Sequence, residues 1–322
     1  MIRFLLRRLI FALVLLVCTS SAALLLTRLA PGDVTAQLGP TASPRDIEAT
    51  RARFDLDRNP LAQWAIWAGR AVRLDFGDSF LYNRPVGPLV IRAAGNTAAL
   101  ALVALALATL AGISLGIISG SRQGSRMSAL VGGASVVCLS LPPLLTSLVL
   151  VFIAARTGWL PPGGMSSANA SDLGWARWAL DVAWHLPLPA LALAVPIAAV
   201  FERLQSQSMA DAVQQPFVLA AIARGVPPRD LILRHAWPVS LRPLCAVYGL
   251  VIGALLSGSF IVEYVTAWPG VGRLMYEALR ARDIYLVAAC AAMGACFLAI
   301  GTLAGDLMLA AADPRVRGAH EP

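Results

Sequence analysis

Residues 257–260 read Ser-Gly-Ser-Phe inside an apolar run, where a serine is a candidate nucleophile of an intramembrane enzyme. Such a nucleophile needs a base within hydrogen-bond reach. The three histidines are His185 and His235, at the edges of apolar runs, and His320 near the C-terminus. We therefore expect no catalytic pair at Ser257, and we interpret its small neighbours as residues that let helices approach closely.

Other residue types disfavour nucleotide, metal and redox chemistry. All 26 basic residues are arginines, so the lysine that a P-loop or a Schiff base requires is missing. The five cysteines lie in apolar runs without C-x-x-C spacing, which indicates buried apolar side chains. We expect this chain to bind no cofactor and no metal.

Three carboxylates lie toward the ends of apolar runs. Glu202 and Glu263 are expected to sit at helix ends, where they reach water or an arginine in structural roles. Asp306 has the residue type of a proton relay in a membrane. We interpret it instead as a structural residue that helix packing holds near the membrane interface.

The composition is that of an integral membrane protein. Of the 322 residues, 58% are hydrophobic and 14% are charged, against about 45–50% and about 25% in soluble domains. A spanning helix needs about 20 mostly apolar residues. This length predicts six transmembrane helices, at residues 9–29, 98–119, 127–155, 185–201, 243–262 and 284–305. Three prolines, Pro187, Pro189 and Pro196, are expected to make the fourth short and bent.

Arginine and tryptophan positions predict the orientation. Arg3, Arg7 and Arg8 precede the first apolar run, and arginines recur in the short segments after the second, fourth and sixth runs. Short arginine-bearing segments stay on the cytoplasmic side of a membrane. Tryptophans gather at membrane interfaces, and with this orientation all of them except Trp237 fall on the extracytoplasmic side. Both termini are therefore expected in the cytoplasm. The net charge of +8 then reflects topology and does not indicate nucleic acid.

A long extracytoplasmic region, residues 31–94, follows the first predicted helix. It is expected to contain a helix near residues 43–54, with Ser43 as N-cap and Pro44 in the first turn. A cleaved signal peptide is the alternative for the first span. Because its apolar run continues to Leu26, longer than the usual signal, we expect an uncleaved anchor.

Residues 220–238 place arginines, prolines and a histidine between two apolar segments. Pro216 can open a short helix that Gly225 ends in a left-handed cap. Pro227 and Pro228 then start a second helix, which we expect to stop at Pro238. From physics alone, two interpretations of this amphipathic segment stay open: docking in a groove of a partner protein, or binding to anionic lipid.

The segment resembles the coupling segment of permease subunits of binding-protein-dependent ABC importers. The stretches "AAIARG" (220–225) and "HAWPVSLRP" (235–243) are similar, at the same spacing, to the pattern of the dipeptide/oligopeptide/nickel branch. Further similar stretches follow in order along nearly the whole chain: "FDLDRNPLAQWAIW", "LDFGDSF", "NTAALAL", "AWPGVGRLMYEAL" and "ADPRVR". The chain departs from the pattern at Leu219, at Arg224, which replaces a lysine, and at Pro238 and Val239.

This resemblance implies an all-α polytopic membrane protein with six transmembrane helices and the type I ABC-importer permease fold. It implies an N-terminal anchor helix and extracytoplasmic region (1–94), a permease transmembrane core (95–317) with a cytoplasmic coupling loop (203–242), and a cytoplasmic tail (318–322). The location implied is the bacterial inner membrane, and the chain itself would not be an enzyme.

The resemblance also implies partners and site residues. The partners are a second homologous permease subunit, two cytoplasmic ATPase subunits that bind ATP and magnesium, an extracytoplasmic substrate-binding protein and the lipid bilayer. The implied ATPase-coupling residues are Ala220, Ala221, Arg224, Gly225, Arg229, Leu231, Arg234 and His235. The translocation-path candidates, polar residues of uncharged spans, are Ser114, Ser135, Ser140, Thr146, Ser257 and Ser259.

The sequence thus predicts the permease subunit of an ATP-driven importer, with short peptides as the default substrate. Nickel or another small solute stays open, and so does whether the two permease subunits are identical. An ion-coupled secondary transporter is the alternative class. It is expected to place ionisable groups near mid-membrane and often to show repeated halves, and the sequence shows neither.

Overall fold

The computed structural model describes residues 2–30, 35, 43–53, 56–169 and 174–312. These residues are mostly helical and form no β-strand, apart from an isolated bridge between Asp78 and Pro85. The predicted all-α class is confirmed. Internal contacts divide the chain into two compact units: unit 1 holds residues 1–97 and 269–299, and unit 2 holds residues 98–268 and 300–322.

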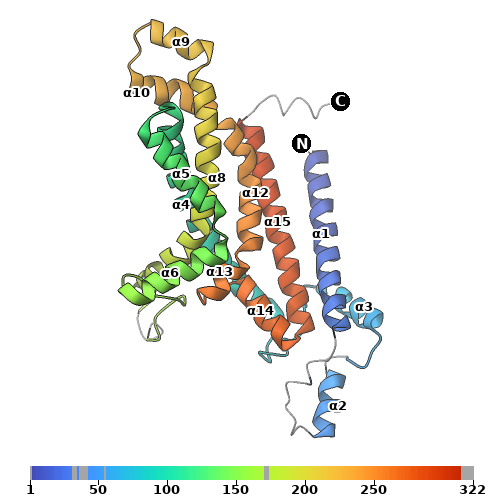
Figure 1. Cartoon of the computed structure of the whole chain (residues 1–322). Coiled ribbons are helices and arrows are strands. Elements are labelled where there is room, and N and C mark those ends of the chain that lie inside the picture. Colours follow the sequence, from blue (N-terminus) through green and yellow to red (C-terminus); the bar gives the residue numbers. More distant parts are fainter. Residues whose placement is uncertain (1, 31–34, 36–42, 54–55, 170–173, 313–322) are drawn as a thin grey trace. The chain divides into compact units, whose positions relative to one another are not determined.

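Unit 1 contains the first apolar helix, α1 (Ile2–Leu29), with α3 (Pro60–Ala71) packed beside it (Figure 1). The helix α2 (Pro44–Arg53) forms where the sequence predicts it, and the Ile47 amide donates to the Ser43 carbonyl at 3.2 Å. The unit also includes α14 (Val271–Ala281) and the first parts of α4 (Val86–Ser121) and α15 (Ile284–Ala312).

Unit 2 is built around α8 (Pro187–Val213), which packs against α5 (Arg126–Ser140) and α6 (Pro143–Thr157). It also holds the remainder of α4 and α15. Its other elements are α7 (Trp175–His185), α9 (Pro216–Ala223), α10 (Pro228–Asp230), a π-helical segment (Leu231–Ala236), α11 (Trp237–Ser240), α12 (Arg242–Gly258) and α13 (Phe260–Val265).

Within the described residues, five helical segments are long and apolar enough to cross a membrane: Leu6–Leu29, Val86–Ser121, Trp175–Val213, Val247–Val265 and Ile284–Met308. A sixth crossing exists if α5 and α6 count as one span, but the two are bent by 102° at their junction. The prediction of an unbroken span over residues 127–155 was wrong. Pro142 and Pro143 lie at the bend, where proline removes backbone donors and restricts the preceding residue.

The helix of the fourth predicted span extends beyond the predicted residues. Instead of ending at Phe201, α8 runs from Pro187 to Val213 with Pro196 inside the helix. A proline within a transmembrane helix is tolerated when neighbouring groups satisfy the freed backbone. As a result, α8 reaches without interruption from the apolar core of unit 2 to the segment that contains α9.

Three glycines of α4 lie against α8 with no room for a side chain. A Cβ added at Gly120 would lie 2.3 Å from the Ser206 carbonyl oxygen, and one at Gly116 would lie 2.5 Å from the Gln205 Cβ. At Gly112 the nearest atom is the Phe201 Cβ, at 2.6 Å. Small residues at this spacing let two helix backbones approach closely, which is how helices associate in lipid.

A second close crossing joins α12 to the end of α15 in unit 2. Gly249 faces Gly305, and a Cβ at either would lie 2.3 Å from the Cα of the other. One turn away, a Cβ at Gly301 would lie 2.4 Å from the Gly253 amide nitrogen. Backbone atoms therefore meet directly at both points, so any side chain there would separate the two helices.

The α4–α8 crossing predicts a large difference between two glycine substitutions. Gly120→Ala places a methyl group against a backbone carbonyl that cannot rotate away, and overpacking of this kind costs about 1–3 kcal/mol. We expect a clear fall in the midpoint of thermal unfolding in detergent. Gly133→Ala in α5, where nothing lies within 4 Å of the added Cβ, is the control and is expected to be neutral or stabilising. Equal midpoints for the two variants would contradict the close crossing.

Candidate functional site

Residues 216–240, which we call the knuckle, lie at one end of α8 and include α9 and α10 (Figure 1). The first helix begins at Pro216 and ends in a Schellman motif. The Gly225 amide donates to the Ile222 carbonyl at 2.9 Å, and the Val226 amide donates to the Ala221 carbonyl at 3.2 Å. Gly225 has a φ of +77°, so the predicted left-handed cap is confirmed.

The knuckle has an apolar interior of its own. Val218 and Ala221, on one face of α9, are buried against Leu231 in the second half of the knuckle. Val226, directly after the cap, packs on this cluster. A hydrophobic contact across a Schellman motif fixes the angle at which the chain leaves the helix. The two halves of the knuckle are therefore held as one body.

The second half of the knuckle is helical from Pro228 to Ser240, and the prediction that it stops at Pro238 was wrong. A proline ring clashes with the carbonyl four residues earlier in an α-helix. Here the turn before Pro238 is π-helical, and the Trp237 amide bonds to the Ile232 carbonyl five residues back. The wider turn accommodates the proline, so the helix continues.

Two kinds of contact join the knuckle to α8. Ala236 is fully buried and packs with Met209 and Ala212 of α8. Gln205 donates from Nε2 to the Ser240 hydroxyl at 2.7 Å, and both side chains are buried. The same stretch of α8 lies against the glycines of α4. The knuckle thus has a packed and hydrogen-bonded connection to the core of unit 2.

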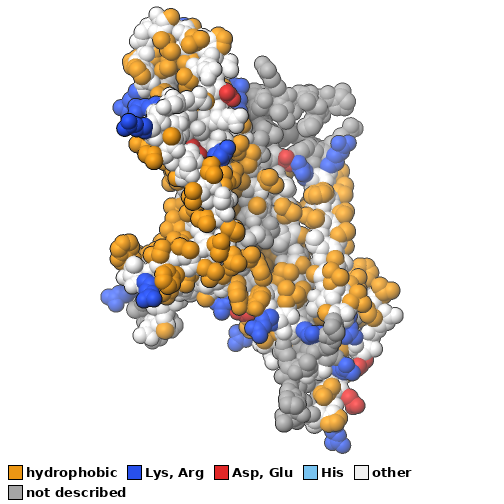
Figure 2. Space-filling view, in the orientation of Figure 1, with side chains coloured by type: hydrophobic (Ala, Val, Ile, Leu, Met, Phe, Trp, Pro, Cys, Tyr) orange, Lys and Arg blue, Asp and Glu red, His pale blue; other side chains and the backbone are white. Residues whose placement is uncertain are grey.

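The outer face of α9 is apolar and uncovered by the described residues. Phe217, Leu219 and Ile222 are 42%, 55% and 51% exposed. Figure 2 shows hydrophobic side chains gathered over α9, at the top of the view. Large apolar side chains that stay exposed together on one short helix are typical of a docking surface. Phe217 and Ile222 were not among the site residues predicted from the sequence. The signal was present in the apolar residues on every face of this short helix, which give it more apolar surface than one contact buries.

The knuckle contains every predicted ATPase-coupling residue, but on different faces. Ala221 and Leu231 are buried in its interior, and His235 is half-buried. The Arg234 Nε lies 3.6 Å from the Asp230 Oδ1, within the same helix. The exposed members of the predicted set are Ala220, Arg224, Gly225, Arg229 and Arg234. Interior members can shape the knuckle, and exposed members can touch a partner.

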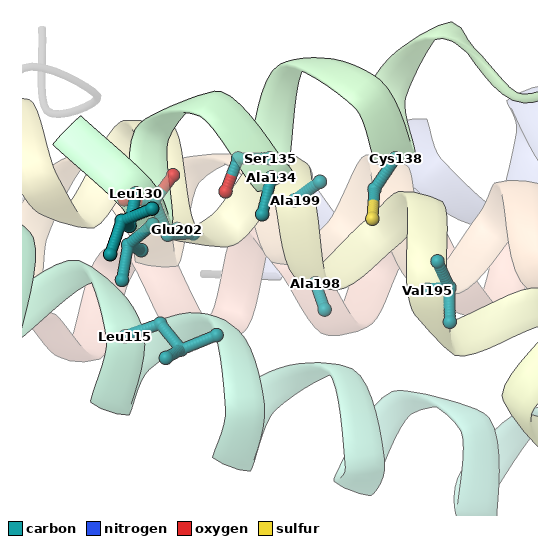
Figure 3. Close-up of a pocket in the computed structure, with 10 residues that line it drawn as sticks. Leu115, Leu130, Ala134, Ser135, Cys138, Val195, Ala198, Ala199 and Glu202 are labelled. Atoms are coloured by element: carbon teal, nitrogen blue, oxygen red, sulfur yellow. The ribbon is translucent and has the colours of Figure 1, made fainter. Parts of the chain in front are cut away.

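A second candidate site is a cavity of about 340 Å³ between α4, α5 and α8 (Figure 3). Leu115 of α4 and Cys138 of α5 form apolar parts of its wall, together with Ala198 of α8. Its polar groups come from Ser135 and Glu202. A mostly apolar hollow with a few polar groups is typical of a small-molecule site.

Glu202 and Glu263 differ from their expected environment. Their exposures are 2% and 0%, so neither side chain reaches water at a helix end. Ser119 donates to the Glu202 Oε1 at 2.6 Å, and Ser259 donates to the Glu263 Oε1 at 2.6 Å. The expectation failed for Glu202 because α8 continues beyond it to Val213. A serine hydroxyl contacts each carboxyl in the place of the expected water.

The predicted translocation-path residues do not meet at one site in the described structure. Ser135 lines the cavity between α4, α5 and α8, while the Ser259 hydroxyl donates a hydrogen bond to Glu263. Ser140 and Thr146 donate to carbonyls of their own helical segments, those of Val136 and Pro142. Ser114 is exposed on α4. The side chain of Ser257 lies outside the described residues.

In unit 1, Asp283 is a buried carboxylate that the sequence analysis missed. Its Oδ2 accepts hydrogen bonds from the Ser79 hydroxyl at 2.7 Å and from the Phe80 and Leu81 amides at 2.6 and 3.1 Å. Its Oδ1 accepts from the Leu286 amide at 3.1 Å, in the first turn of α15. An aspartate directly before an apolar helix is an N-cap signal that could have revealed it.

Tyr82 makes a second link between the same loop and α14. Its hydroxyl donates to the Glu277 carboxylate, which also accepts a 2.9 Å bond from the Arg273 Nε. Burial, followed by this hydrogen bond, raises the pKa of the Tyr82 hydroxyl above its ordinary value. The hydroxyl therefore stays a protonated donor across the physiological pH range. Asp283 and Tyr82 together hold the loop of residues 79–82 in place.

Comparison with known proteins gives consistent similarities. Residues 112–318 match the family described as "Binding-protein-dependent transport system inner membrane component". The oligopeptide transport system permease protein AppB of Bacillus subtilis is 28% identical, over 98% of this chain and 99% of its own length. The oligopeptide transport system permease protein OppB of Mycobacterium bovis is 32% identical over the same shares of the two chains.

Proposed function

The chain belongs to the family of binding-protein-dependent transport system inner membrane components, and from this premise we propose that it is one permease subunit of an ATP-driven importer of short peptides. A second homologous permease subunit completes the translocation pathway. Two cytoplasmic ATPase subunits bind ATP and magnesium, and an extracytoplasmic binding protein delivers the substrate. The chain itself catalyses no reaction and binds no cofactor.

The observation that carries this proposal is the exposed apolar face of α9 on a rigid support. Phe217, Leu219 and Ile222 offer a hydrophobic anchor, and Arg224 and Arg229 lie exposed nearby in the chain. Interface centres are typically apolar and aromatic, with arginine also enriched. A groove on each ATPase subunit that accepts this face would cover surface that the described residues leave open.

The connection between the knuckle and α8 supports a lever mechanism. When the ATPase subunits close on nucleotide, they move the knuckle, whose interior packing keeps it from deforming. Ala236 and Ser240 pass that movement to α8 through their contacts with Met209 and Gln205. Because α8 packs against the α4 glycines, the two helices respond together, and the spans exchange between inward-open and outward-open arrangements.

The peptide substrate is proposed from the relatives, whose names specify oligopeptide transport. The chain covers nearly their whole length, so the likeness is not confined to one shared segment. Identification of the ligand that co-purifies with the cognate binding protein tests this part of the proposal. A nickel complex or another small solute in place of peptide would leave the permease function standing and replace the substrate.

The first prediction from the proposed function concerns the cap at Gly225. Its φ of +77° strains any β-branched residue, although no atom lies within 4 Å of an added Cβ. Gly225→Val is expected to keep normal membrane levels while transport and substrate-stimulated ATP hydrolysis fall roughly tenfold, because strain of about 1–2 kcal/mol misorients the second half of the knuckle. Gly225→Asn, which tolerates the left-handed region, is the matched control and should retain most activity. Full transport by the valine variant would count against the lever.

The second prediction concerns the apolar face. Leu219→Asp puts a charge at a 55% exposed position, so folding is expected to persist while the ATPase subunits bind roughly tenfold more weakly, because the charge must be desolvated in the groove. Co-purification of the ATPase subunits with the permease measures this. Gln214→Asp places the same charge at an exposed site just before α9 and should leave binding unchanged. An equal loss of ATPase binding in both variants, or no loss in either, would contradict the docking role of this face.

The third prediction concerns orientation, with both termini proposed to be cytoplasmic. After replacement of the five native cysteines, Arg229→Cys in the knuckle should be shielded from an impermeant thiol reagent applied to intact cells. Ala168→Cys, between α6 and α7, should react, and both positions are exposed in the structure. Labelling at 229 without permeabilisation would reverse the orientation and separate the knuckle from any cytoplasmic ATPase.

A further inference from the structure

Unit 1 contains an apolar cavity of about 510 Å³ between α1, α3, α15 and the first turns of α4. Its volume falls within the roughly 300–1,000 Å³ typical of ligand sites. Leu16, Phe76, Val90 and Met293 are among the side chains that line it. A cavity with walls of this kind favours a ligand with a long apolar part.

The cavity is lined by segments that are long and apolar enough to cross a membrane. Its lining from α1 comes from residues 13–21, around the middle of the apolar span Leu6–Leu29, and its lining from α4 and α15 comes from the first half of each helix. In a membrane, acyl chains rather than water surround such segments. The lining side chains Val72 and Leu74, directly after α3, are 86% and 80% exposed, as expected of residues that contact lipid.

One polar group in the cavity wall lacks a partner. Trp67 is 5% exposed, and its indole Nε1 has no acceptor among the described residues. The neighbouring Trp64 differs, because its Nε1 donates to the Ser21 hydroxyl at 2.8 Å. A buried donor in an apolar setting is unfavourable without an acceptor. The ligand is therefore expected to carry a hydrogen-bond acceptor at one end of its apolar chain.

Positive charge lies beside the rim. Arg70, in the last turn of α3, and Arg73 are exposed next to the lining residues Val72 and Leu74. Arginine binds phosphate oxygens well, often through two parallel hydrogen bonds. An acyl chain, an ester carbonyl and a phosphate, in that order, match the apolar wall, the Trp67 donor and these arginines.

We propose that unit 1 holds a structural phospholipid, with one acyl chain in this cavity, an ester carbonyl toward the Trp67 indole and the phosphate near Arg70 and Arg73. This site is independent of the coupling role of the knuckle. It would join α3 to α1 and α15 through a bound lipid in addition to the Trp64 hydrogen bond.

The test uses the full-length chain in nanodiscs that contain a small fraction of phosphatidylglycerol with a photoreactive diazirine on its acyl chain. After illumination, mass spectrometry is expected to find label concentrated on peptides that contain residues 13–21 and 289–296. Gly87→Leu, whose added Cβ would lie 4.0 Å from the Phe76 ring and whose side chain enters the cavity, should reduce this labelling at least about fivefold, since the chain is displaced. Gly95→Leu, on the same helix with open space around it, should not change it.

Trp67→Phe provides a second test because it keeps an aromatic ring and removes only the N–H donor. It should reduce labelling about fivefold, the factor that one net hydrogen bond contributes. Labelling that is equal in wild type and Gly87→Leu, or no higher on the cavity peptides than on the exposed face of α5, would show only surrounding bilayer lipid and overturn the proposal. Equally strong labelling by a fatty acid with the same diazirine would also overturn it, since no phosphate would then be recognised.

Discussion

The approach of α4 to α8 leaves no space for a Cβ at Gly112, Gly116 or Gly120, and the rest of unit 2 is arranged around this contact. Lipid provides little hydrophobic driving force between helices, so close packing and interhelical hydrogen bonds must hold them together. The crossing also sets the register of α8. With that register, Ser119 of α4 reaches the Glu202 carboxyl, and a buried acidic side chain becomes part of the helix interface. A shift of one residue along α8 would separate this pair.

The same register places the polar connection to the knuckle. Gln205 packs on Gly116 with its carbon atoms and extends its amide nitrogen to Ser240, so one side chain touches both the core crossing and the knuckle. The π-helical turn before Pro238 lets the second helix continue to Ser240 and complete this contact. Coupling in the proposed function needs this continuity, because a helix that ended before Pro238 would leave the knuckle attached by a flexible chain.

Features that depend on residues close together in the sequence could be predicted, and features that depend on contacts between distant residues could not. Apolar length and cap chemistry are local, so the helical class, the helix at Pro44–Arg53 and the left-handed Gly225 could be predicted. The sharp bend at Pro142 could not be predicted in the same way. Two consecutive prolines can either kink a helix or break it, and tertiary packing decides between the two. The Asp283 contact to Ser79 joins residues 204 positions apart, and no local pattern reports such a pairing. At the site, the alanine and arginine pattern identified the knuckle, but only packing distinguishes the buried Ala221 from the exposed Ile222.

Hydroxyl groups in the spans bear on where substrate affinity arises. Ser140 and Thr146 bond to carbonyls of their own segments, and Ser119 and Ser259 bond to buried carboxyls, so these groups already have partners. A cargo acceptor that took one of these hydroxyl protons would have to break an existing bond, and the net gain would be small. Tighter binding in the pathway would also add about 1.4 kcal/mol to release for each tenfold in affinity. A transporter that receives its cargo from a separate binding protein does not need tight binding in the pathway. Self-satisfied hydroxyls in the permease are therefore compatible with rapid release and with specificity that resides in the binding protein.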